Sequence, residues 1–174
     1  MRLSRLLLLL LLPSALVAQD PRLTARFSRE SAARISAVIE SAVAEGLPAE
    51  PLVLRALEGS VKGATDDRIL QVLARLRSSL HLARVTLGPG VESADLTVAA
   101  AALQAGVPEA RVAELQRWRN GRPLTAPLGA YLDLVARGVP GEQAWSQISG
   151  LAQRRAADRE YIGLVTGPRR PDDD

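Results

Sequence analysis

The chain has no cysteine, one histidine and few aromatic residues, and each shortage excludes a class of protein. Without cysteine it forms no disulfide, no thiolate metal site and no lipid-modified N-terminal cysteine. Its single histidine, His81, lies between leucines in a helical pattern, where a partly exposed side chain is the usual outcome. Aromatic residues make up 3% of the chain, so the core has to be aliphatic. We therefore expect no metal, no cofactor and no catalytic residues.

The sequence also lacks the patterns of strands and of common active sites. No segment sustains the alternation of apolar and polar residues that marks a half-buried strand. No nucleophile elbow, phosphate loop, calcium loop or zinc signature is present. Apolar residues instead recur at spacings of three and four, which is typical of amphipathic helices. The pattern predicts an all-α protein, either an irregular bundle or a short solenoid of about seven helices.

The first eighteen residues have the order of a secretory signal peptide. Two arginines precede an unbroken leucine run at 6–12, and the segment closes on the small residue Ala18. The apolar stretch 6–18 is shorter than the roughly 20 residues that a spanning helix needs, which favours cleavage over a permanent anchor. The sequence thus predicts a periplasmic or secreted protein, with no stable membrane span once residues 1–18 have been removed.

Charge is nearly balanced once this leader is set aside. The whole chain has 22 Lys+Arg and 19 Asp+Glu, a net charge of +3. Removing Arg2 and Arg5 leaves 20 basic residues against 19 acidic ones. Such a balance creates no broad field to attract phosphate backbones, so we expect no nucleic-acid partner.

The rest of the chain divides by composition into three parts. Residues 19–27 are polar, contain a proline, and are expected to form a flexible arm. The helical domain is expected at 28–165, and a Gly-Pro-Gly break inside it could separate sub-bundles at 28–86 and 91–165. The polar end of the chain, 166–174, is expected to be a disordered tail.

One local pattern predicts the corners between helices. It consists of a glycine, an aliphatic residue and a proline, and it occurs as AVAEGLP (42–48), ALQAGVP (102–108) and LVARGVP (134–140). Glycine ends one helix in the left-handed conformation, the aliphatic side chain tucks into the crossing, and proline begins the next helix. Gly63-Ala64-Thr65 is a looser fourth case. The uneven spacing of the copies weakens the case for a strict repeat array.

The stretch 96–119 resembles a DNA-binding helix-turn-helix. The resemblance rests on the spacing of five residues, Ala102, Gly106, Val107, Val112 and Leu115. It implies that the segment from Pro108 to Trp118 lies in the major groove. The basic residues that could contact phosphates are Arg111, Arg117, Arg119 and Arg122. Export, balanced charge and the recurrence of the same corner elsewhere favour an ordinary helical corner instead.

The pair Glu40-Ser41 resembles the glutamate–serine pair of lytic transglycosylases, in which the glutamate is a general acid. The resemblance implies an enzyme acting on cell-wall glycan. The glycine-rich groove motifs and the aromatic lining of that family are missing from the chain. Glu40 would have to be buried to act as an acid, and its place on an amphipathic helix favours a solvated position.

The absence of assembled chemistry favours a non-catalytic binding or structural role in the cell envelope, with an unidentified protein or envelope component as partner. The two alternatives are the glycan-active enzyme using Glu40 and the nucleic-acid binder using 96–119. A binding role predicts a groove lined by leucine and valine with arginine at its rim. We expect Trp118, Tyr131 and Trp145 in the core, whereas two of them exposed side by side would mark a binding surface.

Overall fold

A computed structural model describes residues 20–167, which form nine helices and no strands. The leader and residues 168–174 lie outside the described residues. The helices are α1 (Pro21–Thr24), α2 (Arg29–Ala44), α3 (Glu50–Val61), α4 (Asp66–Leu87), α5 (Ser93–Gln104), α6 (Glu109–Arg119), α7 (Thr125–Ala136), α8 (Gly141–Gln153) and α9 (Asp158–Thr166). The all-helical prediction is confirmed for this part of the chain. The count exceeds seven because short helices form at both ends of the array.

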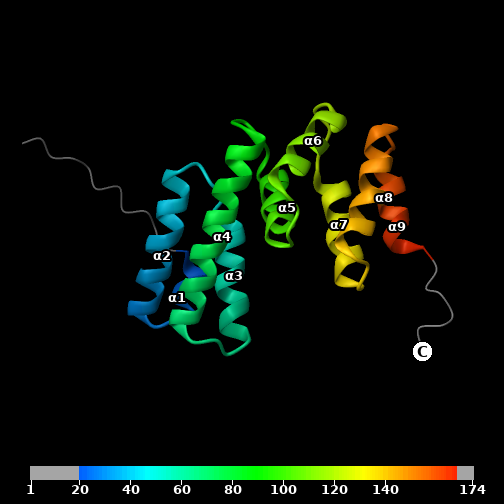
Figure 1. Cartoon of the computed structure of the whole chain (residues 1–174). Helices are drawn as coiled ribbons and strands as arrows, with labels where there is room; N and C mark the ends of the chain where they lie inside the picture. Colours follow the sequence, from blue (N-terminus) through cyan, green and yellow to red (C-terminus); the bar gives the residue numbers. More distant parts are fainter. Residues whose placement is uncertain (1–19, 168–174) are drawn as a thin grey trace, which may run out of the picture.

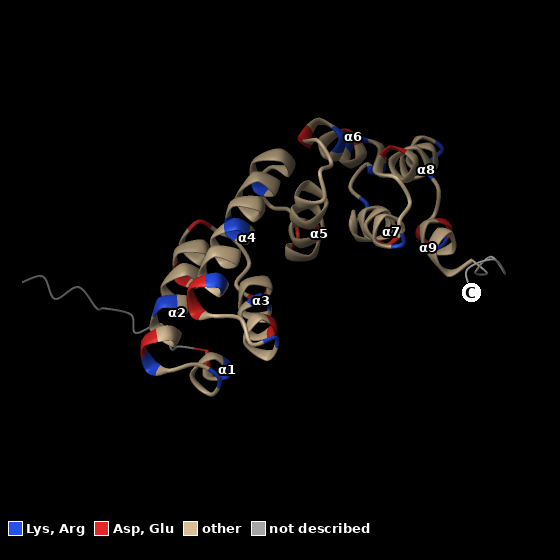
Figure 2. Cartoon of the chain, turned by 60° about the horizontal axis from the view of Figure 1, so that its bottom comes forward, with Lys and Arg blue, Asp and Glu red and all other residues tan. Residues whose placement is uncertain are grey.

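The helices are arranged in two rows that curve into an arch (Figures 1 and 2). The outer row runs along the convex side, where α2 contacts α4, α4 contacts α6 and α6 contacts α8. The inner row runs along the concave side, where α5 contacts α7 and α7 contacts α9. The rows pack on each other through α3 with α4, α4 with α5 and α7 with α8. Contacts between every second helix are those of a short solenoid.

One apolar core runs through both rows from Leu23 to Val165. Its tightest part is the packing of α4 on α5, where Ala99, Ala100 and Ala102 are completely buried. Alanines let two helices approach closely because their side chains add little between the backbones. The Gly-Pro-Gly break at 88–90 lies between these two helices, so it is a bend across which the core continues.

The predicted corners form as expected around glycines with positive φ. Gly46, Gly106 and Gly138 have φ of 75°, 92° and 87°. In each corner the next N–H donates to a carbonyl five residues earlier: Leu47 to Ala42 (2.9 Å), Val107 to Ala102 (3.0 Å) and Val139 to Leu134 (3.0 Å). This is the Schellman arrangement, which satisfies a carbonyl at the end of the first helix. The prolines differ from the prediction, because Pro108 and Pro140 occupy the N-cap rather than the first helical position.

A further corner of the same kind joins α8 to α9 and has no glycine. Arg155 takes the left-handed conformation at φ 56°, and the N–H of Ala156 donates to the carbonyl of Leu151 at 3.0 Å. The sequence pattern does not reveal this corner, because an arginine stands where the other corners have glycine. A side chain in that conformation costs about 1 kcal/mol.

The segment expected as a flexible arm is packed against the domain instead. Asp20 caps α1 by accepting a hydrogen bond from the N–H of Arg22 at 2.9 Å. Leu23, on the same short helix, is 1% exposed and belongs to the core. Helix α1 contacts both α2 and α3. Composition alone suggested a loose arm because a single buried leucine among polar residues gives no periodic signal.

Side-chain caps begin α2 and α4 but not α5. Ser28 accepts from the N–H of Ser31 at 3.1 Å, and Thr65 accepts from the N–H of Arg68 at 3.4 Å. Both side chains therefore satisfy a free donor at a helix start. Ser93 is the first residue of α5 and does not cap it, and Glu92 precedes it as N-cap without a side-chain bond.

Candidate binding groove

A groove of about 770 Å³ opens between α3, α5 and α7, along the inner row of the arch. Its walls are aliphatic, with Leu54 from α3, Ala94, Val98 and Ala101 from α5, and Leu132 from α7. Prolines and an alanine at the start of α3 close one end, and Glu50, Ser93 and Thr97 are its polar lining. We call this surface the inner groove.

The groove follows from the residues that α3 and α5 turn away from the core. Leu52 and Val53 on α3 are buried, and Leu54, next in the chain, is 53% exposed. On α5 the outward side chains are mostly small, so the surface between α3 and α7 is hollow rather than filled. The ribbons of α5 and α7 are almost free of charged residues in Figure 2. Only Asp95 and Asp133 are charged on these two helices.

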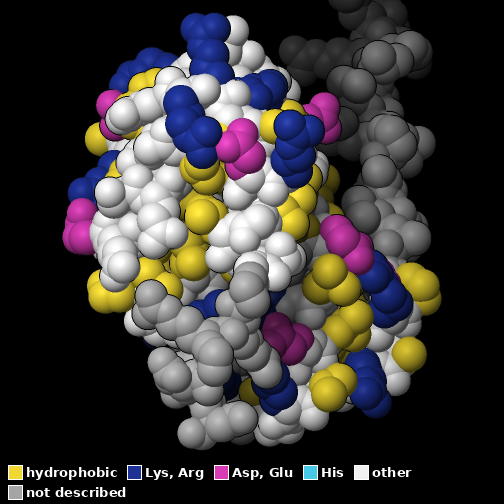
Figure 3. Space-filling model, turned by 90° about the vertical axis from the view of Figure 1, so that its right-hand side faces the viewer, with side chains coloured by type: hydrophobic (Ala, Val, Ile, Leu, Met, Phe, Trp, Pro, Cys, Tyr) yellow, Lys and Arg dark blue, Asp and Glu magenta, His cyan; other side chains and the backbone are white. Residues whose placement is uncertain are grey.

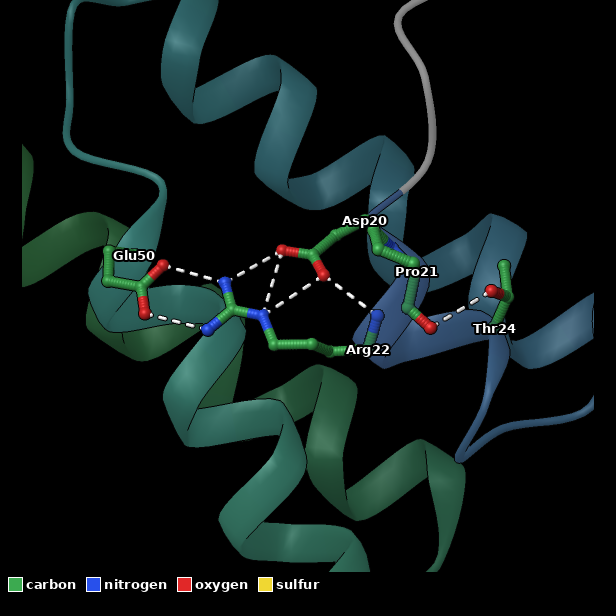
Figure 4. Close-up of polar contacts among 5 residues, drawn as sticks. All are labelled: Asp20, Pro21, Arg22, Thr24 and Glu50. Carbon is green, nitrogen blue, oxygen red and sulfur yellow. Dashed lines mark hydrogen bonds and ion pairs between the residues drawn. The ribbon is translucent and has the colours of Figure 1, made fainter.

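An arginine clamp fixes the edge of the groove where α1 meets α3 (Figure 4). Arg22 donates from its two terminal nitrogens to the two oxygens of Glu50 at 2.8 and 2.7 Å. Its Nε and Nη2 also donate to the carboxylate of Asp20, at 3.1 and 2.8 Å. A guanidinium matched to two carboxylates in this way is held in one orientation. The arginine clamp therefore sets the position of the chain at Asp20 relative to Glu50.

The arginine clamp is an electrostatic unit as well as a geometric one. Hydrogen bonds from Arg22 lower the pKa of the Asp20 carboxyl below its ordinary value of 3.8 and that of Glu50 below 4.5. The same bonds, first to Glu50 and then to Asp20, raise the pKa of Arg22. All three groups are therefore charged at neutral pH, and together they add one negative charge to this edge.

Two other hollows in the described surface have several charged side chains in their lining. One of about 710 Å³ is lined by Arg55, Arg75, Ser79 and Gln104, and its Arg55 is paired with Glu58 at 2.9 Å. Another of about 550 Å³ is lined by Glu45, Arg77 and His81, and Arg77 forms an ion pair with Glu45. Long charged side chains lose rotamer freedom and hydration when a partner covers them. The inner groove offers apolar area without that cost.

Glu40 lies exposed on α2, in the outer row. A glycosidase acid works in a desolvated cleft beside a second carboxylate. The structure places Glu40 instead on an open helix face, as expected for an amphipathic helix. This position gives no support to the glycan-active enzyme.

The segment that resembles a helix-turn-helix forms α5 and α6, and the second helix is built into the outer row between α4 and α8. Val112 and Leu115 are buried in the core. Arg111 donates to both carboxylate oxygens of Glu142 on α8, at 2.9 and 2.8 Å, and lies 5.7 Å from the centre of the Trp145 ring. These contacts engage Arg111, one of the side chains that a DNA-reading helix would present, whereas Arg117 is exposed.

Arg119, expected as a possible phosphate contact, is buried at 1% exposure and the expectation is wrong. Its Nη2 pairs with Asp158 at 2.5 Å, and its Nε donates to the carbonyl of Pro123 at 3.0 Å. The guanidinium also lies 5.5 Å from the centre of the Tyr161 ring. Burial raises the pKa of the Tyr161 hydroxyl. Arg119 thus joins α6 to α9, and Arg122 adds a bond to the carbonyl of Ala156 at 3.1 Å.

The aromatic residues and the histidine take the places expected of them. Tyr131 and Trp145 are buried and meet edge to face at 6.0 Å, joining α7 to α8, while Trp118 is partly buried against the core. His81 is exposed on α4, with its Nδ1 3.7 Å from Glu45. Among residues 20–167, no three His, Asp or Glu side chains lie close enough together to hold a metal ion. No helix in that range is long and apolar enough to cross a membrane.

Leu54 is the functional candidate that sequence reasoning missed. The stretch PLVLRAL at 51–57 gives no reason to separate this leucine from its apolar neighbours. Arg119 had a clearer signal, since it continues the buried stripe of Val112 and Leu115 at a spacing of four.

Seen from the C-terminal end of the array, basic and acidic side chains are interspersed, with small hydrophobic areas between them (Figure 3). Among the described residues visible in this view, no continuous patch of one charge is seen. Comparison with known proteins finds no matching family model, no similar curated protein and no similar solved structure.

Proposed function

We propose that this chain is an exported, non-catalytic protein that binds an apolar helix of another polypeptide in the inner groove. The observation that carries the proposal is the exposed aliphatic lining, above all Leu54 at 53% exposure beside Val98 and Leu132. Depletion of charge and exposure of large aliphatic side chains mark the centre of protein interfaces. The lining agrees with the leucine and valine groove that a binding role predicts, and Arg22 stands at its rim.

A helical partner fits the chemistry of this groove better than an extended one. An extended segment has to place its backbone N–H and C=O groups on partners, as it does at the edge of a sheet. The polar lining consists of Glu50, Ser93 and Thr97, and the carboxylate of Glu50 is already hydrogen-bonded to Arg22. Few polar groups therefore remain to pair with the backbone of an extended partner. A helix satisfies its own backbone and needs only an apolar face, with side chains spaced at three, four and seven residues.

Export to the periplasm or beyond is the second part of the proposal. It is supported by the basic, leucine-rich and small-residue order of residues 1–18, which lie outside the described residues. Fractionation of cells tests it separately from binding. The processed chain is expected outside the inner membrane, and an intact chain in the cytoplasm would contradict export.

Site-specific photo-cross-linking in the native envelope tests the binding proposal. A photoreactive residue at Leu54 is compared with one at Val85, which is 66% exposed on α4 of the outer row. We expect the Leu54 probe to form one protein adduct whose cross-linked peptide maps to an apolar helical segment. The Val85 probe should form little of it.

Three outcomes would contradict the proposal. Equal adducts from Leu54 and Val85 would show contact without a preferred surface. An adduct with glycan would favour the enzyme alternative, and one with nucleic acid would favour the segment 96–119. Thermal unfolding of both probe-bearing chains confirms that they are folded, because both positions lie on the surface.

A further inference from the structure

The same polypeptide contains an apolar segment that can reach the inner groove. We propose that in the unprocessed chain the leucine run at 6–12 occupies the inner groove, and that removal of the leader opens it to partners. The inference rests on the proposed function, because both assign an apolar helix to the same surface.

The point of attachment supports this occupant. The described chain begins at Asp20, which the arginine clamp holds beside Glu50 at the edge of the inner groove (Figure 4). Residues 13–19 connect that point to the leucine run. Seven residues in extended form span up to about 24 Å, so the run can reach any part of a groove formed by three neighbouring helices.

The leader also has matching size and chemistry. As a helix, residues 3–12 would span about 15 Å, comparable to the width of two packed helices. Seven consecutive leucines present an apolar surface in every direction around that helix. Burying them against Leu54, Val98 and Leu132 would remove aliphatic surface on both sides from water.

Charge complements this arrangement. Arg2 and Arg5 precede the leucine run, and exposed acidic residues lie beside the inner groove. The basic residue Arg55, which adjoins Leu54, is already paired with Glu58. Glu92 and Asp133 are exposed and adjoin the lining residues Ser93 and Leu132 in the chain, and the arginine clamp adds a further net negative charge. Basic residues ahead of an apolar helix are the chemistry that such a rim favours.

The absence of cysteine makes the inference directly testable in the full chain. Single cysteines replace each of Leu7, Leu8, Leu9 and Leu10 in turn, so that one helical turn is covered. Each is combined with Leu54→Cys or, as the matched control, with Val85→Cys. The unprocessed chains are made by translation without membranes and then oxidised. Intramolecular disulfides are measured by mass spectrometry.

We expect at least one leader position to cross-link to Leu54→Cys about tenfold faster than to Val85→Cys, since local concentration governs the rate. Equal rates at all four positions would overturn the inference. Cross-links found only between two chains would also overturn it, because the leader would then be occupying a second copy. The photo-cross-linking of the processed chain is independent of this result. The proposed function can therefore hold when the inference fails, and the inference can hold when the proposed function fails.

Discussion

The central helices of the outer row and those of the inner row differ in how many charged residues they carry. Helices α4 and α6 of the outer row carry eleven Asp, Glu and Arg residues, whereas α5 and α7 of the inner row carry two. Many of the outer charges hold neighbouring helices together, as Arg111 does with Glu142 and Asp67 with Arg34 at 3.0 Å. On α5 and α7, Asp95 accepts from the N–H of Leu124 at 2.7 Å.

The difference shows which surface has been left for a partner. A solenoid needs contacts between successive helices, and the outer row supplies part of them with ion pairs and hydrogen bonds. The inner row relies on alanine and leucine packing, which leaves small and aliphatic side chains facing the concavity. A concave surface with few charges can be covered at low desolvation cost.

The sharpest test of the inner row compares its buried and exposed leucines. Leu96→Ala on α5 removes a fully buried side chain and should lower the free energy of unfolding by about 2–5 kcal/mol. Leu54→Ala, on the groove side, should cost less than about 1 kcal/mol because half of that side chain is already in water. Urea denaturation measures both. Similar losses would show that Leu54 is a core residue and not a surface one.

The next test separates Arg119, a buried charge on α6 of the outer row, from its partner Asp158 on α9 of the inner row. Asp158→Ala should cost about 2–3 kcal/mol, because it leaves the Arg119 guanidinium buried without its carboxylate. Arg119→Met should cost less, since it removes the charge from the core and leaves Asp158, which is half exposed, in water. Thermal and urea unfolding of the two variants show which of them loses more stability. The reverse order would mean that packing around Arg119, and not its charge, holds α6 to α9.

The corners that join the two rows offer a stabilising change. Arg155→Gly places glycine at the left-handed position between α8 and α9 and should stabilise the fold by about 0.5–1 kcal/mol. The matched control, Gly106→Ala, puts a Cβ on a residue with φ 92° and should destabilise by about 1 kcal/mol. Opposite shifts in Tm are expected. A loss of stability in Arg155→Gly would show that this side chain contributes more than its strain costs.

The smallest effect is expected at the arginine clamp. Asp20 and Glu50 have lowered pKa values when folded, so the clamp adds stability above pH 4.5 and loses it as the pH falls through the lowered values. The Tm difference between wild type and Arg22→Gln should therefore be present at neutral pH and disappear once acid has protonated Asp20 and Glu50. Arg26→Gln, on the same exposed segment, is the control and should show no such dependence. A difference that persists in acid would assign the effect to packing of the Arg22 side chain.

Much of this architecture can be predicted from the sequence because its signals are local. Helical spacing, Ser28 and Thr65 as caps, and Gly106 and Gly138 at corners each depend on a few adjacent residues. The α8–α9 corner and the packing of Leu23 could not be predicted, because Arg155 and a lone leucine give no such signal. Tertiary contacts decide both.

The chemical character of the candidate site could be predicted from the sequence, but its position in the fold could not. The composition led to a groove of leucine and valine, yet Leu54 looks like its buried neighbours in the sequence. Its exposure depends on where α5 and α7 lie relative to α3, which is set by packing between helices that are distant in the chain. Arg119 shows the converse, since a charged residue that looked available for phosphate is enclosed by α9.

The most direct test of the central claim is the affinity of the helical segment identified by cross-linking, measured for wild type, Leu54→Glu and Val85→Glu. A charge in the inner groove should weaken binding at least about tenfold, while the same charge on α4 should leave it unchanged. Equal affinities for the two variants would contradict the assignment of the inner groove as the binding surface.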